Sequence, residues 1–295
     1  MNNQKLVLGI PKGSFQEYTL KIFQEAGFNI DVPKRGYHVA IDDPEIDCFL
    51  LRPQEIPRYA AAGKLDLGIS GDDWIASTKT SGKVIEVSDL KYSKTGIQRK
   101  VTWVLAVPQN SPMQSVKDLQ GKTISTEVIA LAKQYLAKHK VKAKLEFSWG
   151  ATEGKPPRFA DAIIDITETG SSIKANNLRI IDTVFQSSTK LIASPLAWKN
   201  PQKREKIKNI ALLLDGAVKG DVMVNLFFHA PRRILKKALK ISPRLKSPTI
   251  NRMIGTPLLD VAICCPADRT RELIPKLKRM GAKDIVEIPL IKLIP

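Results

Sequence analysis

The sequence predicts an α/β protein with two lobes of the periplasmic-binding-protein type around a cleft, followed by a C-terminal ferredoxin-like domain. Short apolar runs alternate with amphipathic stretches through the first two-thirds of the chain, which is typical of α/β folds. After residue 216 the order changes to strand, helix, two strands, helix and strand, as in ferredoxin-like domains. The length of 295 residues is enough for two or three domains with a sizeable core.

The first lobe is expected to comprise residues 1–100 and 187–215. Its apolar runs predict buried strands, and its amphipathic runs predict helices that proline opens or glycine closes. The later part of this lobe is expected because a strand and a long helix follow the second lobe and are long enough to rejoin the first. The strands are predicted at 5–10, 46–51, 65–70 and 190–194, and the helices at 15–26, 53–63 and 195–216.

The second lobe is expected at residues 101–186, and the ferredoxin-like domain at residues 217–295. Gly216 and Gly220 are predicted to form a hinge before this last domain. In the second lobe, strands are predicted at 101–107, 122–126, 143–148, 161–166 and 178–184, and a strong helix at 127–139.

The composition restricts the class of protein. Forty-seven basic against 29 acidic side chains give a net charge of +18, which favours an anionic partner, either nucleic acid or a phosphorylated small molecule. Solvated helix faces explain the same charge. No apolar run approaches the roughly 20 residues that cross a bilayer, and the start of the chain does not read as a signal peptide, so we expect a cytoplasmic protein without a membrane partner. Three cysteines and three scattered histidines predict no metal site made only of side chains.

The most informative segment lies at residues 161–172, where an apolar strand runs into Thr-Glu-Thr-Gly-Ser-Ser. Hydroxyls and backbone N–H groups at the start of a helix can hold an anion, and Gly170 lets the backbone approach a phosphate closely. A turn capped by Ser171 or Ser172 explains the same letters. Carboxylates beside a phosphate are adverse unless they hold sugar hydroxyls, a metal or a developing positive charge. The nearby Asp161, Asp165 and Glu168 therefore favour a phosphorylated sugar as the ligand.

Basic loops in the first lobe predict a second anion site. Lys12 and Gly13 follow one strand and Arg52 follows another, and Arg35 lies in a loop between them. Open α/β sheets bind ligands at the carboxyl ends of their strands. Asp73, in the Gly-Asp-Asp-Trp segment, is either part of a magnesium or nucleotide loop or the cap of the following helix.

These segments resemble the ATP phosphoribosyltransferase family, the first enzyme of histidine biosynthesis, in its long form with a C-terminal regulatory domain. The resemblance covers nearly the whole chain, and its most specific part is DITETGSS, whereas PKG alone would be weak. It is carried by LGIPKGSFQEYTLKIFQEAGF, LRPQEIPRYAAAGKLDLGISGDDW, SWGATEGKPP, DAIIDITETGSSIKANNLRIIDTV and GAKDIVEIPLIKLIP.

The resemblance implies transfer of a 5-phosphoribosyl group from phosphoribosyl pyrophosphate (PRPP) to N1 of ATP, with release of pyrophosphate. Mg²⁺ is implied as the cofactor, held mainly by substrate. The resemblance assigns PRPP binding to Asp165, Thr167, Glu168, Thr169, Gly170, Ser171 and Ser172. It assigns ATP or pyrophosphate binding to Lys12, Gly13, Arg52 and Asp73, and catalysis to Arg35, Arg52, Asp165 and Glu168.

One departure from the family pattern affects the expected mechanism. Many relatives have arginine after PKG, whereas this chain has Ser14, so stabilisation of pyrophosphate is expected to depend more on Arg35, Arg52 or the metal. The adenine nitrogen already carries a lone pair at neutral pH, and no histidine base is evident. Catalysis is therefore expected to consist of positioning and electrostatics.

The resemblance also implies a homo-oligomer, either a dimer or a hexamer, with histidine as a feedback inhibitor in the third domain. Asn225 and Ser247, Pro248 and Thr249 are the residues expected at that site. Asn225 stands where relatives often place an acidic or polar residue, so we expect weaker inhibition than an acidic pocket would give.

Two other functions remain open on the residues alone. Paired α/β lobes also describe solute-binding proteins, but the lack of a signal peptide and the DITETGSS segment count against this. The basic charge suggests a nucleic-acid-binding protein, but no basic stripe is interleaved with aromatic residues. We therefore expect ATP and PRPP as partners and no nucleic acid.

Overall fold

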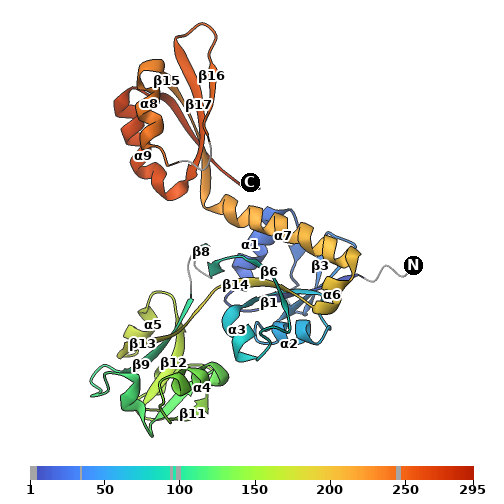
Figure 1. Ribbon diagram of the computed structural model, residues 1–295, viewed down its shortest axis with the longest axis vertical. Helices are drawn as coiled ribbons and strands as arrows, with labels where there is room; N and C mark the ends of the chain where they lie inside the picture. The colour runs from blue at the N-terminus through green and yellow to red at the C-terminus, as the bar shows by residue number, and fades with distance from the viewer. Residues whose placement is uncertain (1–4, 34, 94–95, 98–100, 244–246) are drawn as a thin grey trace. The chain divides into compact units, whose positions relative to one another are not determined.

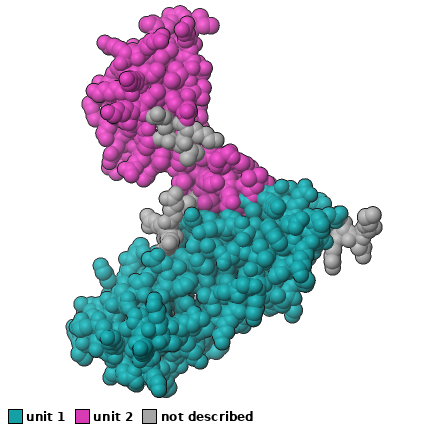
Figure 2. Space-filling model, viewed as in Figure 1, with its two compact units in different colours: residues 1–21, 28–211 teal, residues 22–27, 212–295 magenta. Residues whose placement is uncertain are grey.

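A computed structural model describes residues 5–33, 35–93, 96–97, 101–243 and 247–295. It confirms the mixed α/β fold class, with two α/β sheets and a third sheet near the C-terminus. The chain divides into two compact units (Figure 2). The first unit contains residues 1–21 and 28–211, and the second contains residues 22–27 and 212–295.

The first sheet has seven strands in the order β2-β3-β4-β1-β5-β14-β6. Its centre is parallel: β1 pairs with β4 on one side and with β5 on the other. These central strands consist largely of buried apolar residues because helices cover a parallel sheet on both faces. The strands are β1 (Leu6–Pro11), β2 (Ile30–Asp31), β3 (His38–Ile41), β4 (Ile46–Leu51), β5 (Leu67–Gly71), β6 (Ile85–Asp89) and β14 (Thr189–Ala193).

The helices of the first lobe lie between successive strands of this sheet in the sequence or follow its last strand, β14. The helices are α1 (Gln16–Ala26), α2 (Ile56–Ala61), α3 (Asp72–Ser77), α6 (Pro195–Lys199) and α7 (Pro201–Asp221), of which α1 and α7 extend into the second unit. Ile56 of α2 and Ile75 of α3 lie in one core cluster with Leu65, which precedes β5, and all three are at most 4% exposed.

The second sheet has five strands in the order β11-β10-β12-β9-β13. Three of them, β10, β11 and β12, are parallel, and the antiparallel strand β9 lies between β12 and β13. The elements are β9 (Val101–Pro108), η1 (Val116–Leu119), β10 (Thr123–Thr126), α4 (Ile129–Lys138), β11 (Lys144–Phe147), η2 (Thr152–Gly154), β12 (Ala162–Thr167), α5 (Ser171–Ala175) and β13 (Leu178–Ser187).

Both sheets share one strand order. Numbered along the chain, the three parallel strands of each sheet lie in the spatial order second, first, third. An antiparallel strand pairs with the outer side of the third. In the first sheet that antiparallel strand is β14, which the chain forms only after it has completed the second sheet. The two-stranded ribbon of β7 (Tyr92–Ser93) and β8 (Gly96–Ile97) lies on the outward passage. The chain thus passes from the first sheet to the second and returns, which is the arrangement expected of two periplasmic-binding-protein-like lobes.

The C-terminal unit has the ferredoxin-like order of elements. Its antiparallel sheet runs β16-β17-β15-β18, and α8 and α9 pack on one face (Figure 1). Alternate residues of β15 and β17 are buried beneath these helices, among them Leu226, Phe228 and Ile263. The elements are β15 (Met223–Pro231), α8 (Arg232–Ile241), β16 (Thr249–Arg252), β17 (Leu258–Pro266), α9 (Ala267–Met280) and β18 (Lys283–Pro289).

The single helix predicted at 195–216 is wrong, because the chain forms α6 and α7 instead. Asn200 interrupts the helix before Pro201, as expected since a residue before proline disfavours helical geometry. The Asn200 side chain then accepts the backbone N–H groups of Gln202 and Lys203 at 3.0 and 3.2 Å. The missing helical bonds are thereby replaced by a cap.

The hinge predicted at Gly216 and Gly220 is also wrong. Both glycines lie inside α7, which continues to Asp221. A Cβ on Gly220 would lie 2.6 Å from the carbonyl oxygen of Ile291, and one on Gly216 would lie 2.8 Å from Cγ1 of Ile294. The glycines allow the C-terminal segment to approach the helix rather than allowing the backbone to bend.

The short strands β2, β3, β6, β7 and β8 were not predicted, because their two to five residues carry little periodic signal. Residues 98–100, beside the expected lobe boundary, lie outside the described part of the chain. Among the described helices, none combines the length and the apolar character needed to span a bilayer.

Candidate active site

The carboxyl ends of β10, β11 and β12 meet at one edge of the second sheet, because these strands are parallel neighbours. The loops that leave this edge contain residues 127–128, 148–161 and 167–172. Ligands of open α/β sheets bind at this edge. The structure therefore brings the predicted PRPP segment beside two loops that the sequence reasoning did not single out.

The loop at residues 167–172, called the cradle below, turns sharply after β12. Gly170 has φ +76° and is the N-cap of α5. Its N–H donates to the Thr167 hydroxyl at 2.8 Å, and the Thr169 hydroxyl donates to that of Ser171 at 3.0 Å. Neither Ser171 nor Ser172 caps the helix, so the capped-turn interpretation is wrong. A Cβ on Gly170 would meet nothing within 4 Å, so the space before the loop is open.

Asp165 is buried within β12, two residues before the cradle begins, and is 9% exposed. Burial, together with the nearby Glu153 and Glu127 carboxylates, raises the pKa of Asp165 to about 7, although the Ile166 N–H donates to it at 2.8 Å. Burial and Glu153 likewise raise the pKa of Glu127, while Lys155 and Arg52 lower it. The edge of the sheet is thus an acidic site with cations on its rim.

Glu127, Glu153 and Lys155 are functional candidates that the sequence reasoning missed. Lys155 donates to the hydroxyls of Ser125 at 3.1 Å and Ser148 at 2.7 Å, and both serines are buried. The signal for these residues was available, since Glu127 follows one parallel strand and Glu153 and Lys155 follow another, as the cradle follows the third.

Glu168, expected near the ribose, accepts a hydrogen bond from the buried Ser93 hydroxyl at 3.1 Å. Ser93 belongs to β7, on the passage between the two lobes. Glu168 therefore lies in the cradle but contacts the connection between lobes, whereas Asp165 lies inside the sheet.

The predicted basic residues occupy loops of the first sheet. Lys12 lies directly after β1, with its ammonium 4.3 Å from the ring centroid of Tyr37, and Gly13 has φ +116°. Arg52 is exposed directly after β4, and Arg35 is exposed in the loop before β3. Lys12 and Arg52 follow neighbouring parallel strands, and the backbone N–H of Lys12 donates to the carbonyl of Leu51 at 2.7 Å.

Asp73 differs from Lys12, Gly13 and Arg52, the other residues predicted to bind ATP or pyrophosphate, because it is buried and its carboxylate is already bonded. Oδ2 accepts Trp103 Nε1–H at 2.7 Å, and Oδ1 accepts the Ser187 hydroxyl at 2.7 Å. The Trp74 N–H also donates to Oδ1, at 2.9 Å. Burial raises the pKa of Asp73 despite these three donors. This geometry favours a structural link from α3 to β9 and β13 rather than contact with ATP.

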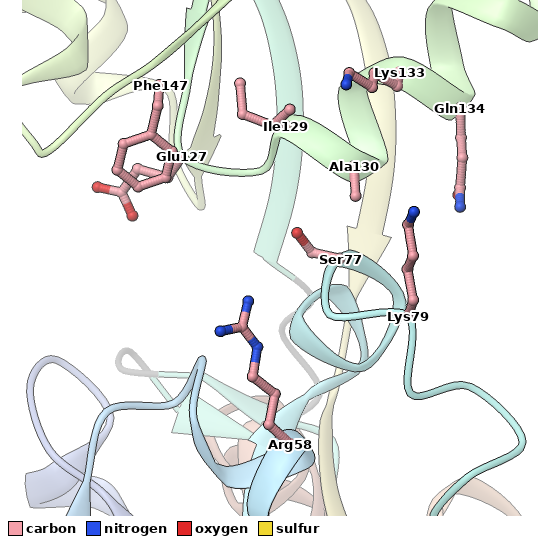
Figure 3. A pocket seen from close by; sticks show the side chains of 9 residues that line it. All are labelled: Arg58, Ser77, Lys79, Glu127, Ile129, Ala130, Lys133, Gln134 and Phe147. Atoms are coloured by element: carbon pink, nitrogen blue, oxygen red, sulfur yellow. The ribbon is translucent and has the colours of Figure 1, made fainter. Parts of the chain in front are cut away.

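A pocket of about 520 Å³ separates α2 and the end of α3 from α4 and the end of β11. Figure 3 shows Arg58 and Lys79 reaching toward the wall that bears Glu127, Ile129 and Phe147. None of the predicted site residues lines it. The remaining lining residues are Ser77, Ala130, Lys133 and Gln134.

Over the described residues, no group of three or more His, Cys, Asp or Glu side chains is arranged to hold a metal ion. Mg²⁺ usually binds through one or two carboxylates plus substrate phosphates. A single carboxylate at the sheet edge, such as that of Asp165, fits that mode of binding.

Two of the four residues expected at the regulatory site, Asn225 and Thr249, lie on the face of the C-terminal sheet opposite the helices. Asn225 alternates with buried residues of β15 and pairs with Cys264 of β17. Thr249 pairs with Ala262, two residues along the same strand, and therefore shares that face. Ser247 and Pro248 precede β16.

Comparison with known proteins identifies the family. Residues 52–216 match the family model described as ATP phosphoribosyltransferase, and residues 220–292 match the model for the HisG C-terminal domain. The chain belongs to the ATP phosphoribosyltransferase family. It is accordingly a transferase, and its family acts in histidine biosynthesis.

Full-length relatives support this membership. The chain is 49% identical over 293 residues to the ATP phosphoribosyltransferase of Chlorobaculum parvum, covering 99% of both chains. It is 48% identical to that of Thermodesulfovibrio yellowstonii over the whole of both chains. A chain of the ATP phosphoribosyl transferase HisG:HisZ complex from Thermotoga maritima shares the fold, with a TM-score of 0.60 and 24% identity over 71% of this chain and 98% of that one.

Proposed function

We propose that this ATP phosphoribosyltransferase transfers the phosphoribosyl group of PRPP to N1 of ATP at the carboxyl edge of the second sheet. The observation that carries the proposal is the cradle beside Asp165. Gly170 leaves open space before the backbone there, and the same loop carries the hydroxyls of Thr169 and Ser171. The 5-phosphate of PRPP would bind to Thr169, Gly170, Ser171 and Ser172, with Thr167 holding the loop and Asp165 near the ribose.

The chain's own residues supply positioning and charge. Arg52 and Arg35 are exposed cations on loops of the first sheet, and they would neutralise the pyrophosphate as it leaves. Lys12 and Gly13 would bind phosphates of ATP or the leaving group. Asp165 in its ionised form would stabilise positive charge at the anomeric carbon of the sugar.

Mg²⁺ would be held mainly by the pyrophosphate of PRPP, and Asp165 would supply a carboxylate ligand from the protein. When bound, the ion neutralises charge on the leaving group. The protein would contribute the Asp165 carboxylate as a ligand for the ion. Lys155 holds the loop after β11 against the sheet edge through its hydrogen bond to Ser125.

We extend the proposal to organisation and control. The two lobes would comprise residues 1–100 with 187–215 and residues 101–186, and the C-terminal domain would bind histidine as a feedback inhibitor. Support for a regulatory role comes from the match of residues 220–292 to the HisG C-terminal domain. A homo-oligomer, dimer or hexamer, would be the working form.

The cradle is tested by Gly170→Ala, alone and with Thr169→Val. A Cβ at φ +76° strains the backbone, and loss of the hydroxyl removes a donor, so PRPP affinity should fall about tenfold or more in the double variant. Affinity for ATP should be unchanged. Titration calorimetry with PRPP and with ATP measures both.

Gly121→Ala is the matched control. Gly121 has φ +75° and open space around its Cβ position, but it precedes β10 at the opposite edge of the same sheet. It should lose stability without losing PRPP affinity. Unchanged PRPP affinity in the folded Gly170 variants would remove the cradle from the site.

A further inference from the structure

An aromatic pair stands exposed at the edge of the candidate site. The side chain of Trp149 is 93% exposed and that of Phe147 is 49% exposed. Their ring centroids are 4.7 Å apart in an edge-to-face arrangement at 76°. Tryptophan is on average highly buried in folded proteins, so such exposure leaves a large apolar surface without a partner in the described chain.

The backbone beneath this pair is held firmly. Ser148, between the two rings, is fully buried and shares a hydrogen bond with the Thr152 hydroxyl at 2.7 Å. Lys155 donates to the same serine oxygen at 2.7 Å. The rings therefore project from an anchored segment, which lowers the entropy cost of binding a ligand against them.

The pair lies where a second substrate would meet the phosphoribosyl group. Phe147 ends β11, and the sheet order places β10 between β11 and β12. Two strand spacings amount to about 10 Å, which is of the order of the length of a phosphoribosyl group. A phosphoribosyl group bound at the cradle is thus long enough to reach the part of the sheet edge that bears these rings.

The pocket beside the pair has the charge that a nucleoside triphosphate needs. Phe147 lines it together with one carboxylate, Glu127, and three cations, Arg58, Lys79 and Lys133. An apolar ring surface in a pocket with more positive than negative charge matches a ligand with a flat base at one end and phosphates at the other.

We propose that Trp149 and Phe147 form the platform on which the adenine ring of ATP stacks. The assignment adds a substrate-binding pair to the known reaction, and its orientation rests on the proposal that PRPP binds at the cradle. Every base has a π face, so the platform gives affinity for a purine while hydrogen bonds elsewhere select adenine.

The test compares Trp149→Ala and Trp149→Phe with the wild-type enzyme. We expect the dissociation constant of ATP to rise about tenfold or more in Trp149→Ala and to recover largely in Trp149→Phe, because a phenyl ring still stacks. The inhibition constant of inorganic tripolyphosphate, which has no base, should be unchanged. PRPP affinity should also be unchanged.

Phe159→Ala is the matched control, since Phe159 is 68% exposed and precedes the start of β12 at the opposite edge of the sheet. It should leave ATP affinity unaltered. Fluorescence provides a second readout: ATP should quench tryptophan emission in the wild-type protein, and Trp149→Phe should lose that quenching while it still binds ATP.

Three outcomes would overturn the platform. ATP affinity could be unchanged in Trp149→Ala, or ATP and tripolyphosphate could weaken equally, or the variant could change its oligomeric mass with ATP affinity intact, which would assign Trp149 to a contact with a second copy. If instead the Gly170 variants keep PRPP affinity while Trp149→Ala loses ATP affinity, the cradle fails and the platform stands.

Discussion

Asp165 shows how one residue can be both structural and functional. It lies within a parallel strand, where water cannot solvate its charge, yet it is beside the cradle that would receive an anion. Because its pKa is raised from 3.8 to about 7, the folded protein retains a proton that the unfolded chain releases. This group's contribution to stability is complete below about pH 3.8 and is lost as the pH rises toward 7.

Asp165→Asn should therefore gain stability relative to the wild type as the pH rises. The neutral amide removes the cost of the buried charge, so the difference in free energy of unfolding should grow in favour of the variant between about pH 4 and pH 8. At about 1.4 kcal/mol per unit of pKa, the upper limit is about 4 kcal/mol. Urea unfolding of both proteins at about pH 4 and pH 8 measures this difference in the free energy of unfolding. A difference that does not change with pH would show that burial of the Asp165 charge does not destabilise the wild type.

Asp73 is expected to act on stability rather than on ATP binding. Asp73→Ala leaves the buried Trp103 and Ser187 donors without their acceptor, which should lower the free energy of unfolding by about 2–4 kcal/mol. Asp72→Ala, which removes an acceptor for only the Ser188 N–H, is the control and should cost less. The KM for ATP should stay within a factor of two in both variants, and a large rise for Asp73→Ala alone would restore its predicted role in binding ATP.

At the scale of elements, α7 and the C-terminal segment depend on each other. The Leu293 N–H donates to the Gly216 carbonyl at 2.8 Å, so the segment after β18 is tied to the helix. Lys292 also donates to the carbonyl of Ala26, the last residue of α1, at 3.1 Å. The last residues of the chain thus hold two helices, which explains why glycine occurs twice within α7.

The two glycines of α7 form a matched pair for experiment. Alanine in a helix interior is favoured over glycine by about 1 kcal/mol. At Gly216 the new Cβ meets the flexible end of Ile294, so Gly216→Ala should be close to neutral. At Gly220 it meets the backbone of Ile291 and Lys292 within 2.6–2.8 Å, so Gly220→Ala should lose stability by about 1–3 kcal/mol. Thermal unfolding of both variants measures the contrast, and equal effects would show that the segment moves away at no cost.

At the scale of the whole molecule, three sheets have separate tasks. Both α/β sheets present carboxyl ends of parallel strands that bear the predicted ligands, and the C-terminal sheet leaves one face free of its own helices. Asn225 and Thr249 share that face. The proposed histidine site therefore lies on a surface that the catalytic residues do not use.

Histidine at millimolar concentration should inhibit the enzyme, and Asn225→Asp should strengthen the inhibition about tenfold because a carboxylate can pair with the ligand's ammonium group. Asn225→Ser is the neutral control and should not strengthen it. Removal of residues 222–295, after the end of α7, should abolish inhibition. If histidine neither inhibits the intact protein nor raises its thermal midpoint, the domain has another role, such as assembly.

The main elements were predictable because their signals are local. The strands at 5–10, 46–51 and 161–166 were each predicted to within one residue, since buried parallel strands read as continuous apolar runs. The C-terminal order of elements was also correct, because alternation in strands and spacing in helices differ clearly. The cradle was singled out by its glycine and hydroxyls, a short pattern that follows one strand, and its role in binding PRPP stays a prediction.

The sequence by itself determined the main elements and the family, and it predicts the segment that would bind a phosphate. The tertiary structure decided which polar groups satisfy one another. Asp73 meets partners 30 and 114 residues away, Lys155 meets Ser125, and Gly220 meets Ile291. Periodicity over a few residues specifies a helix or a strand, but burial of a carboxylate or a close approach of backbones depends on segments that only long-range packing brings together.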